Sequence, residues 1–320
     1  MESLENIKVS ILVPVYNVEK YIGRCLDSIF NQSFRNIEYV FVNDNTPDTS
    51  VQIINEYIDN YNIFDKCKLI NHDVNLGISQ TRNDCLKYAT GDYLLFVDSD
   101  DYIEYDMVEL LLNAAIQGNA DVTGCGYTEE FPNYSVDHPQ YYSKNHIEMM
   151  RAITLLEIKG VLWKLLIRHD IIRNNGLSFP SDKRVNEDYY FCCKLFYYSK
   201  SFASVDKCLY HYVQYNPNNL TKISIQNIES QAAAIKVIED FYREKEVYNI
   251  VENELNRRKF VSKLPLLLNK TCFDVKKWRT LFPESNYVMT QMNFSVGNKL
   301  ICFLASSPFY WLVPFLRLFR

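Results

Sequence analysis

The chain has 320 residues, of which 48% are hydrophobic, so it is long and apolar enough to form one large globular domain or two smaller ones. Its 34 Lys and Arg against 39 Asp and Glu give a net charge of −5, which excludes a general attraction for nucleic acid. Nine scattered cysteines without a CxxC pair favour reduced thiols over a disulfide framework. The polar start at Met1 to Lys8 does not resemble a signal peptide, and we expect a cytoplasmic protein.

Strand and helix patterns alternate along the first hundred residues. Apolar runs rich in β-branched residues indicate strands, and apolar residues at spacings of three and four indicate helices, the first of them capped by Asn17. This alternation is typical of a parallel sheet covered by helices on both faces. The expected strands are 9–15, 38–42, 68–70 and 93–97, and the expected helices are 22–30, 51–58 and 78–89.

Polar residues directly follow several of these strands. Tyr16 follows the first strand, Asp44 follows the second, and the segment Asp98-Ser99-Asp100-Asp101 follows the fourth. In open parallel sheets, ligands bind beyond the carboxyl ends of the strands, near the point where the strand order reverses. We therefore expect one crevice to collect these residues.

The acidic segment 98–101 is a candidate metal site. In an extended chain Asp98 and Asp100 face the same way, whereas Asp101 turns aside and is interpreted as a turn residue. Two carboxylates aimed at one point repel each other unless a cation lies between them, and their hard oxygen atoms suit Mg²⁺ or Mn²⁺. An acidic turn after a strand explains the same four residues equally well.

The pattern is less regular from residue 107 onward. Residues 126–150 are polar and aromatic without a clear period, and we expect mostly loop or a pair of strands there. Glu187 and Asp188 stand at the start of an apolar helix, where capping alone explains two carboxylates. Other expected elements are a helix at 107–115, strand-like or core-like runs at 120–124, 160–167 and 209–215, and helices at 232–242 and 251–268.

The end of the chain differs in composition from the rest. Beyond Asn216 the pattern changes to helices alone, which predicts a domain boundary there, with residues 216–219 as a turn or linker. Residues 300–319 are almost wholly apolar and are interrupted by two prolines and a basic residue. We expect residues 297–320 to form an apolar, basic segment that lies on an anionic membrane surface. A C-terminal helix docked on its own domain is the competing interpretation.

Taken together, the motifs of residues 7 to 215 resemble the family 2 glycosyltransferases. The resemblance implies a GT-A fold, an α/β fold whose Rossmann-like mixed sheet is flanked by helices and binds a nucleotide-sugar. It assigns residues 1–215 to the catalytic domain and residues 216–320 to a helical C-terminal region. The motifs that carry it are residues 9–17, 42–45, 75–77 with 81–83, 98–101 and 186–188.

The resemblance also implies roles on the donor side. Pro14 and Tyr16 match positions that border the nucleobase, where an aromatic ring stacks on uracil. Asp44 matches the acid that accepts a hydrogen bond from the base, and Arg82 matches an arginine that reaches the base or the phosphates. Asn43 departs from the many relatives that carry a second acid at this position.

Further roles concern the metal and the acceptor. Asp98 matches the first acid of the DXD motif, near ribose or metal, and Asp100 matches the metal ligand proper, with Ser99 between them on the nucleotide-sugar. Asp188 matches the base that deprotonates the acceptor hydroxyl. The residues that match the sugar and acceptor side are Trp163, Lys164 and Glu187.

The implied activity is an inverting, metal-dependent transfer of a sugar from a nucleoside diphosphate, with UDP expected, to a hydroxyl of a glycan or lipid-linked acceptor. The resemblance is to enzymes of bacterial surface polysaccharide synthesis, with contact at the inner membrane surface. A nucleotidyltransferase is an alternative, but it normally uses a glycine-rich phosphate loop where this chain has residues 14–17. A nucleotide-sugar-binding subunit without activity is another, and the joint presence of Asp98, Asp100 and Asp188 argues against it.

Overall fold

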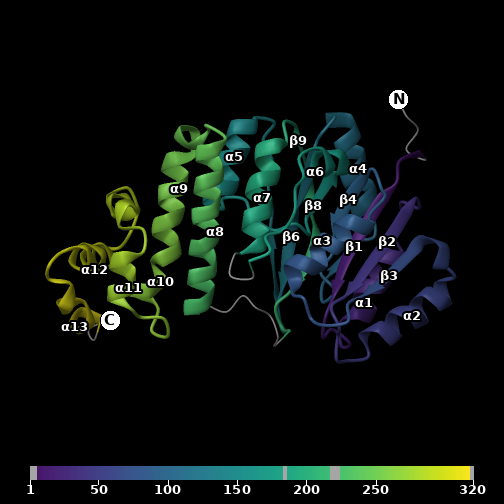
Figure 1. Cartoon of the computed structure of the whole chain (residues 1–320), viewed down its shortest axis with the longest axis horizontal. Coiled ribbons are helices and arrows are strands. Elements are labelled where there is room, and N and C mark those ends of the chain that lie inside the picture. Colours follow the sequence, from purple (N-terminus) through teal and green to yellow (C-terminus); the bar gives the residue numbers. More distant parts are fainter. Residues whose placement is uncertain (1–5, 183–185, 217–223, 318–320) are drawn as a thin grey trace. The chain divides into compact units, whose positions relative to one another are not determined.

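The chain divides into two compact units in a computed structural model, which describes residues 6–182, 186–216 and 224–317. Figure 1 shows a sheet with helices in the first unit and helices in the second. The domain boundary predicted near Asn216 adjoins residues 217–223, which lie outside the described residues, so it stays a prediction. The first unit comprises Met1–Met150, Ile158–Lys183 and Glu187–Asn219, and the second comprises Arg151–Glu157, Arg184–Asn186 and Leu220–Arg320.

Nine strands in the described part of the chain form one sheet, in the order β3-β2-β1-β4-β8-β6-β9-β5, with β7 paired to β6. The strands β1 to β4 run parallel to their neighbours among themselves, and β8 is antiparallel to both β4 and β6. The expected mixed sheet is therefore confirmed. The strands are β1 (Val9–Val15), β2 (Ile37–Asn43), β3 (Cys67–Asn71), β4 (Tyr93–Phe96), β5 (Tyr102–Ile103), β6 (Val122–Glu130), β7 (Ser135–His138), β8 (Leu165–Arg168) and β9 (Phe202–Val213).

The strand order reverses next to β1. The chain passes from β1 outward to β2 and β3, then returns to place β4 on the other side of β1. Such a reversal leaves a crevice between the loops that follow the two central strands, because those loops depart in opposite directions. The segments that follow β1 and β4 border this position.

Helices cover the sheet and form most of the second unit (Figure 1). In the first unit α3 packs on β1 and β2, α4 packs on β6 and β9, and α1 contacts α2. The helices are α1 (Ile22–Phe30), α2 (Ser50–Tyr61), α3 (Ile78–Tyr88), α4 (Met107–Gly118), α5 (His146–Leu155), α6 (His169–Asn174), α7 (Glu187–Tyr198), α8 (Ile225–Glu244), α9 (Tyr248–Lys263), α10 (Pro265–Leu268), α11 (Val275–Thr280), α12 (Val296–Ser306) and α13 (Val313–Arg317), with 3-10 turns at Phe64–Lys66, Pro283–Thr290 and Tyr310–Leu312.

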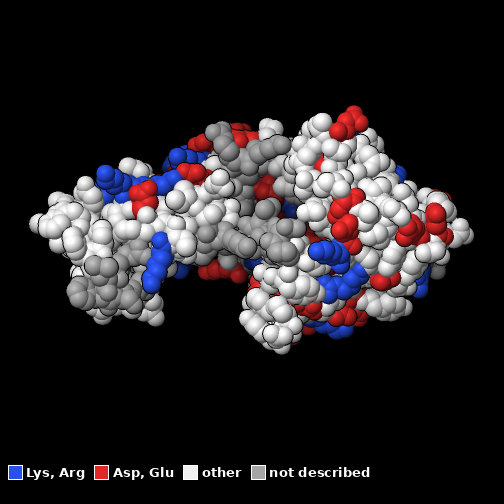
Figure 2. Space-filling model, turned by 90° about the horizontal axis from the view of Figure 1, so that it is seen from below, with Lys and Arg blue, Asp and Glu red and all other residues white. Residues whose placement is uncertain are grey.

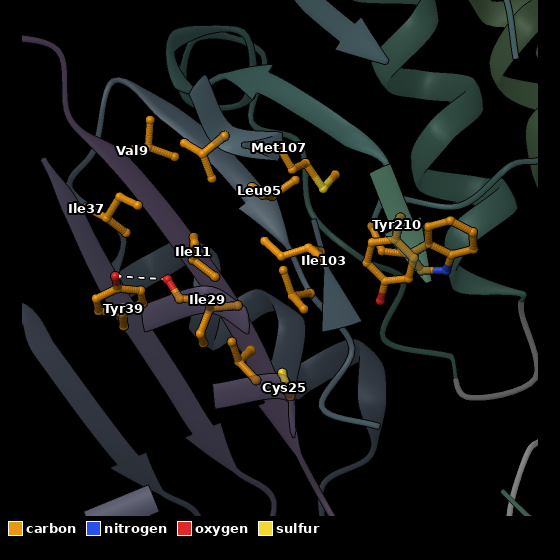
Figure 3. Close-up of a cluster of buried hydrophobic side chains, with 14 of the residues drawn as sticks. Val9, Ile11, Cys25, Ile29, Ile37, Tyr39, Leu95, Ile103, Met107 and Tyr210 are labelled. Atoms are coloured by element: carbon orange, nitrogen blue, oxygen red, sulfur yellow. Dashed lines mark hydrogen bonds between the residues drawn. The ribbon is translucent and has the colours of Figure 1, made fainter. Parts of the chain in front are cut away.

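The largest apolar core of the first unit lies between the central strands and the helices α1 and α4. Every residue of β1 is buried, which is typical of a strand covered on both faces. In Figure 3, Ile11 of β1 and Ile29 of α1 lie in this core beside Tyr39, whose hydroxyl donates to the Ile29 carbonyl at 3.2 Å. The hydrogen bond satisfies a phenol that would otherwise be buried without a partner.

Two local expectations were wrong, and a third was met in part. The stretch 126–150 contains the pairing of β6 with β7, so the expected pair of strands is confirmed, whereas the start of α5 was missed. Asn17 does not cap α1, which begins four residues after Val18; Asn17 instead has φ 55° and donates its backbone N–H to Thr46. The expected helix 251–268 is interrupted at Pro265, because proline has no N–H to continue the ladder. None of the described helices meets the length and hydropathy required to cross a membrane.

Glu38 ties the amino ends of several core elements together. Its buried carboxylate accepts hydrogen bonds from the Ser10 hydroxyl at 2.6 Å and the Thr90 hydroxyl at 2.7 Å, and its oxygen lies 2.8 Å from Lys8 Nζ. Burial raises the pKa of Glu38, but the hydrogen bonds outweigh burial and hold the pKa well below its ordinary range. The ionised form is therefore the one that stabilises the fold.

We expect Glu38→Gln to lower the free energy of unfolding by about 2 kcal/mol near neutral pH, since a charged acceptor of several hydrogen bonds is lost. Because the pKa is depressed on folding, this contribution is present above the unfolded value of about 4.3 and disappears as the pH falls through the folded value. Urea unfolding at several pH values measures it, with exposed Glu56→Gln as the control. Equal losses in both variants would refute the assignment.

Candidate active site

Four side chains from three parts of the chain meet at the carboxyl edge of the central strands. Asp98 directly follows the β4 region, Arg82 lies in α3, and Glu187 and Asp188 form the first turn of α7. The sequence predicted each of these residues for one site, and hydrogen bonds join all four. This cluster, Arg82-Asp98-Glu187-Asp188, is called the Arg82 cluster below.

Arg82 is the centre of the cluster. Its guanidinium is 4% exposed and donates to Asp98 Oδ1 at 3.3 Å, Glu187 Oε1 at 3.1 Å and Asp188 Oδ1 at 2.5 Å. One face lies over the Phe179 ring, 5.6 Å from its centroid. Burial acts to lower the pKa of Arg82, but Asp188, Asp98 and Glu187 raise it above its ordinary value, so the arginine stays charged. The three carboxylates hold the buried Arg82 side chain in place.

The pKa of Asp188 is raised to about 7. Burial is the largest cause, the Arg82 guanidinium opposes it, and the Glu187 and Asp98 carboxylates add to it. A carboxyl that titrates near neutral pH is basic enough to accept a proton and is still ionised in a substantial fraction of molecules. The side chain keeps 21% of its surface exposed, so a substrate hydroxyl has access to it.

Asp44 holds the loop before α3. Its buried carboxylate accepts hydrogen bonds from the backbone N–H of Leu76 at 2.7 Å and of Gly77 at 2.8 Å, and Oδ1 lies 2.9 Å from His72 Nδ1. Gly77 has φ +90°, a backbone conformation that favours glycine. These contacts fix the segment that leads into the helix of Arg82.

Asn43 makes two side-chain hydrogen bonds at the end of β2. Its amide oxygen accepts a hydrogen bond from the Thr46 N–H at 2.8 Å, and its amide nitrogen donates to Asn71 at 2.9 Å. The amide therefore joins the ends of β2 and β3 and shapes the turn that follows.

The three acids of the segment 98–101 have separate partners. Asp98 binds Arg82, Asp100 Oδ2 accepts from Asn216 at 2.8 Å, and Asp101 is 1% exposed. Burial, and then the Asp98 carboxylate, raise the pKa of Asp100. Burial and the Asp100 and Asp98 carboxylates likewise raise the pKa of Asp101, which is held in the core.

Two further residues hold this segment and were missed from the sequence. The Tyr210 hydroxyl donates to Asp101 at 2.8 Å and accepts from the Asp98 N–H at 3.1 Å, and the Val213 N–H donates to Asp101 at 2.8 Å. Both residues belong to β9, more than a hundred residues further along the chain. The alternating pattern of residues 209–215 predicted a strand but not its contact with Asp101. Knowledge of the β5–β9 pairing would have been needed to find it.

Asp98 and Asp100 supply part of the ligand set that a divalent cation needs. No group of three or more His, Cys, Asp or Glu side chains arranged to hold a metal occurs in residues 6–182, 186–216 and 224–317. Asp98 and Asp100 nonetheless supply hard oxygen atoms, and a cation between them would relieve the repulsion that raises the pKa of Asp100. The donor set suits Mg²⁺ or Mn²⁺ if a substrate provides the remaining ligands.

The other predicted residues lie at different depths. Pro14 is buried within β1, Ser99 is buried, and Tyr16 is 48% exposed. Trp163 is buried and stacks on Tyr210, with ring centroids 4.2 Å apart. Lys164 is also buried and donates to Gln140 Oε1 at 2.7 Å, and burial lowers its pKa to about 7. Trp163 supports the ring that holds the acidic segment, while Lys164 lies in the core beside it.

Comparisons with known proteins identify the family of the chain. The family model for Glycosyl transferase family 2 matches residues 10–176. The glycosyltransferase EpsJ of Bacillus subtilis (strain 168) is 31% identical over 276 residues, which cover 82% of this chain and 78% of EpsJ.

Solved structures share the fold. TarS residues 1–349 of S. aureus, in complex with UDP-GlcNAc, superpose with a TM-score of 0.76 at 22% identity, covering 96% of this chain and 90% of that one. The mannosyltransferase PcManGT of Pyrobaculum calidifontis, in complex with GDP-Man and Mn²⁺, gives a TM-score of 0.56 at 14% identity, covering 97% and 85%. The likeness spans nearly the whole of this chain.

We expect Arg82→Gln to lower the free energy of unfolding by about 3 kcal/mol, because it leaves three partly buried carboxylates without their cation. The loss will shrink as the pH is lowered, since protonated carboxyls no longer need the guanidinium. Lys87→Gln, an exposed change on the same helix, is the matched control in urea unfolding. A loss that is independent of pH would show that Arg82 acts by packing alone.

Proposed function

Because the chain belongs to glycosyltransferase family 2, we propose that it transfers a sugar from a nucleoside diphosphate donor to a hydroxyl of a glycan or lipid-linked acceptor, with inversion at the anomeric carbon. The observation that carries the proposal is the Arg82 cluster, which joins Asp188, the expected base, to Asp98 of the expected donor segment. The family assignment favours this activity over nucleotidyl transfer.

Asp188 is the proposed base. The acceptor hydroxyl attacks the anomeric carbon, its proton passes to an Asp188 carboxylate oxygen, and the bond from that carbon to the diphosphate oxygen breaks. The nucleoside diphosphate leaves with the bonding electron pair, and a single displacement inverts the configuration. The raised pKa supports this role, because a more basic carboxylate accepts the proton more readily.

Asp98 and Asp100 are the proposed metal ligands. A divalent cation bound there would act as a Lewis acid on the departing diphosphate. The mutual repulsion of the two acids supports the assignment, as does the Mn²⁺ bound by PcManGT, which shares the fold. Asn216 would orient Asp100 through the oxygen that accepts its amide hydrogen.

UDP is the proposed nucleotide. Asp44 uses three of its about four acceptor positions for Leu76, Gly77 and His72, which leaves one for an N–H of the base. The exposed Tyr16 ring offers a stacking surface at the end of β1, beside Pro14. The UDP-GlcNAc bound by TarS agrees with this choice.

The proposed acceptor is a hydroxyl of a surface polysaccharide or its lipid-linked precursor. The choice of acceptor rests on the motif resemblance and on the position of Glu187 next to Asp188, the proposed base. Trp163 and Lys164 stay predictions for the sugar and acceptor side. Both are buried, and Trp163 reaches the segment 98–101 through Tyr210, so an indirect role fits Trp163 better than contact.

Asp188→Asn tests the base. The change keeps the size of the side chain and removes its basicity, so we expect turnover to fall about a thousandfold with donor affinity nearly unchanged. Screening of nucleotide-sugars with an acceptor glycan supplies the turnover measurement, and titration calorimetry supplies the affinity. Exposed Asp240→Asn is the control.

The pH dependence of kcat provides a second test of Asp188 as the base. Because the pKa of Asp188 is about 7 and the carboxylate is the active form, kcat of the parent enzyme will rise with pH through the neutral range. The residual rate of Asp188→Asn will lack this rise. A variant that keeps both the parent rate and its pH profile would rule out Asp188 as the base.

Asp100→Ala tests the metal site. We expect the affinity for UDP to become independent of Mn²⁺, whereas in the parent protein Mn²⁺ will strengthen binding about tenfold or more. Calorimetric titration with UDP, with and without Mn²⁺, measures both. An affinity that ignores the metal in the parent protein would remove the metal assignment, and metal-dependent donor hydrolysis by the parent would rule out an inactive binding subunit.

A further inference from the structure

The C-terminal part of the second unit exposes large apolar side chains in a short stretch of sequence. Val296 is 85% exposed, and Trp311 is 57% exposed. Soluble surfaces commonly carry single exposed apolar residues, but a concentration of aromatic and aliphatic side chains marks a binding surface. The members of this apolar surface are Val296, Leu300, Phe303, Phe309, Trp311 and Phe315.

The same segment is anchored to its own unit by the opposite face. Ile301, Cys302 and Ala305 of α12 are buried in the apolar core of the second unit. Arg279 of α11 donates to the carbonyls of Ala305 and Ser307, both at 2.7 Å, and so holds the end of α12. The segment is therefore docked on its own unit, and the apolar surface is what docking leaves open.

Helix geometry aligns part of the surface with a basic residue. Val296, Leu300 and Phe303 stand at i, i+4 and i+7 of α12, which places them on one face of the helix. Lys299 lies at i+3 on that face and is exposed. An apolar stripe with an adjacent Lys is typical of helices that lie in a membrane interface.

The charge of the surrounding sequence has one dominant sign. The chain as a whole carries −5, yet no acidic residue follows Glu284. Figure 2 shows few charged side chains at the left end, with both blue and red side chains next to it. From residue 264 onward the acidic residues are Asp274 and Glu284, and the basic residues are Lys270, Lys276, Lys277, Arg279, Lys299, Arg317 and Arg320.

We propose that the apolar surface, with Lys299 and the exposed Lys270 and Lys276, docks the protein on a lipid bilayer rich in anionic headgroups. The apolar side chains would enter the interface, and the ammonium groups would bind the headgroup phosphates. A second copy of the chain is the weaker occupant, because a symmetric contact would bring the basic residues of both copies together. This inference does not depend on the identity of the donor or the acceptor.

Trp311 allows a test on the unmodified protein. The chain has 3 Trp residues, and Trp163 and Trp278 are 3% and 0% exposed, so a change of solvent contact at an exposed indole reports on Trp311. We expect vesicles of phosphatidylcholine with phosphatidylglycerol to shift the Trp emission to shorter wavelength, and brominated lipid to quench it. Vesicles of phosphatidylcholine alone will give a smaller shift, and added salt will weaken binding.

Substitutions identify the residues. Deleting residues 297–320 would also remove Ile301 and Cys302 from the core, so point changes are sharper. We expect Phe303→Ser with Phe315→Ser to lower vesicle partitioning about tenfold or more. Each of Lys270→Gln and Lys299→Gln will lower it about fivefold. The matched control is Phe64→Ser with Tyr141→Ser, which alters two exposed aromatic residues of the first unit.

The results separate the occupants. Unchanged Trp emission with anionic vesicles, or an equal loss of partitioning in the control pair, would overturn the proposal. So would self-association of the parent protein in vesicle-free sedimentation that Phe303→Ser with Phe315→Ser abolishes, because a second copy would then cover the surface. Calorimetric binding of UDP by every variant shows separately whether the first unit remains folded.

Discussion

The buried guanidinium of Arg82 is the interaction on which the site depends. Three carboxylates, from the end of β4 and the start of α7, would repel one another at this distance without a cation among them. Arginine suits the position because its planar donors bind several carboxylate oxygens at once and it stays charged when buried. The position of α7 relative to the sheet edge is thus linked to the charge balance of the site.

A second set of contacts positions the acidic segment from behind. Asp101 accepts hydrogen bonds from Tyr210 and Val213, and Tyr210 stacks on Trp163. With Asp101 held in the core, Asp98 and Asp100 are left to face Arg82 and Asn216. The three acids of one short segment therefore divide into one that holds the fold from the core and two whose partners are polar side chains at the sheet edge.

The sequence predicted the elements up to residue 100 well because hydrophobic period and strand order determine them locally. Strand ends alone pointed to Tyr16, Asp44 and the segment 98–101, whereas Arg82, Glu187 and Asp188, which contact Asp98 from two helices, came from the motif resemblance. It did not predict the partners of Asp101 or Asn43, which depend on the pairing of β5 with β9 and of β2 with β3. Those contacts join residues far apart in sequence, and no local pattern records them. The helix α5 was missed because its apolar residues follow a hairpin without a clear period.

Asp188 must be basic enough to accept a proton and yet be ionised near neutral pH, and its environment meets both requirements. A carboxylate beside Arg82 alone would be stabilised as an anion and would be a weak base, while a carboxyl buried alone would stay protonated. Burial and the neighbouring acids Glu187 and Asp98 raise its pKa, and the guanidinium limits the rise. This intermediate pKa requires that Asp188 share Arg82 with other acids. Because Arg82 pairs with three carboxylates, its single positive charge cannot neutralise any one of them fully. The other acids of the cluster thus help to keep Asp188 suited to accepting a proton near neutral pH.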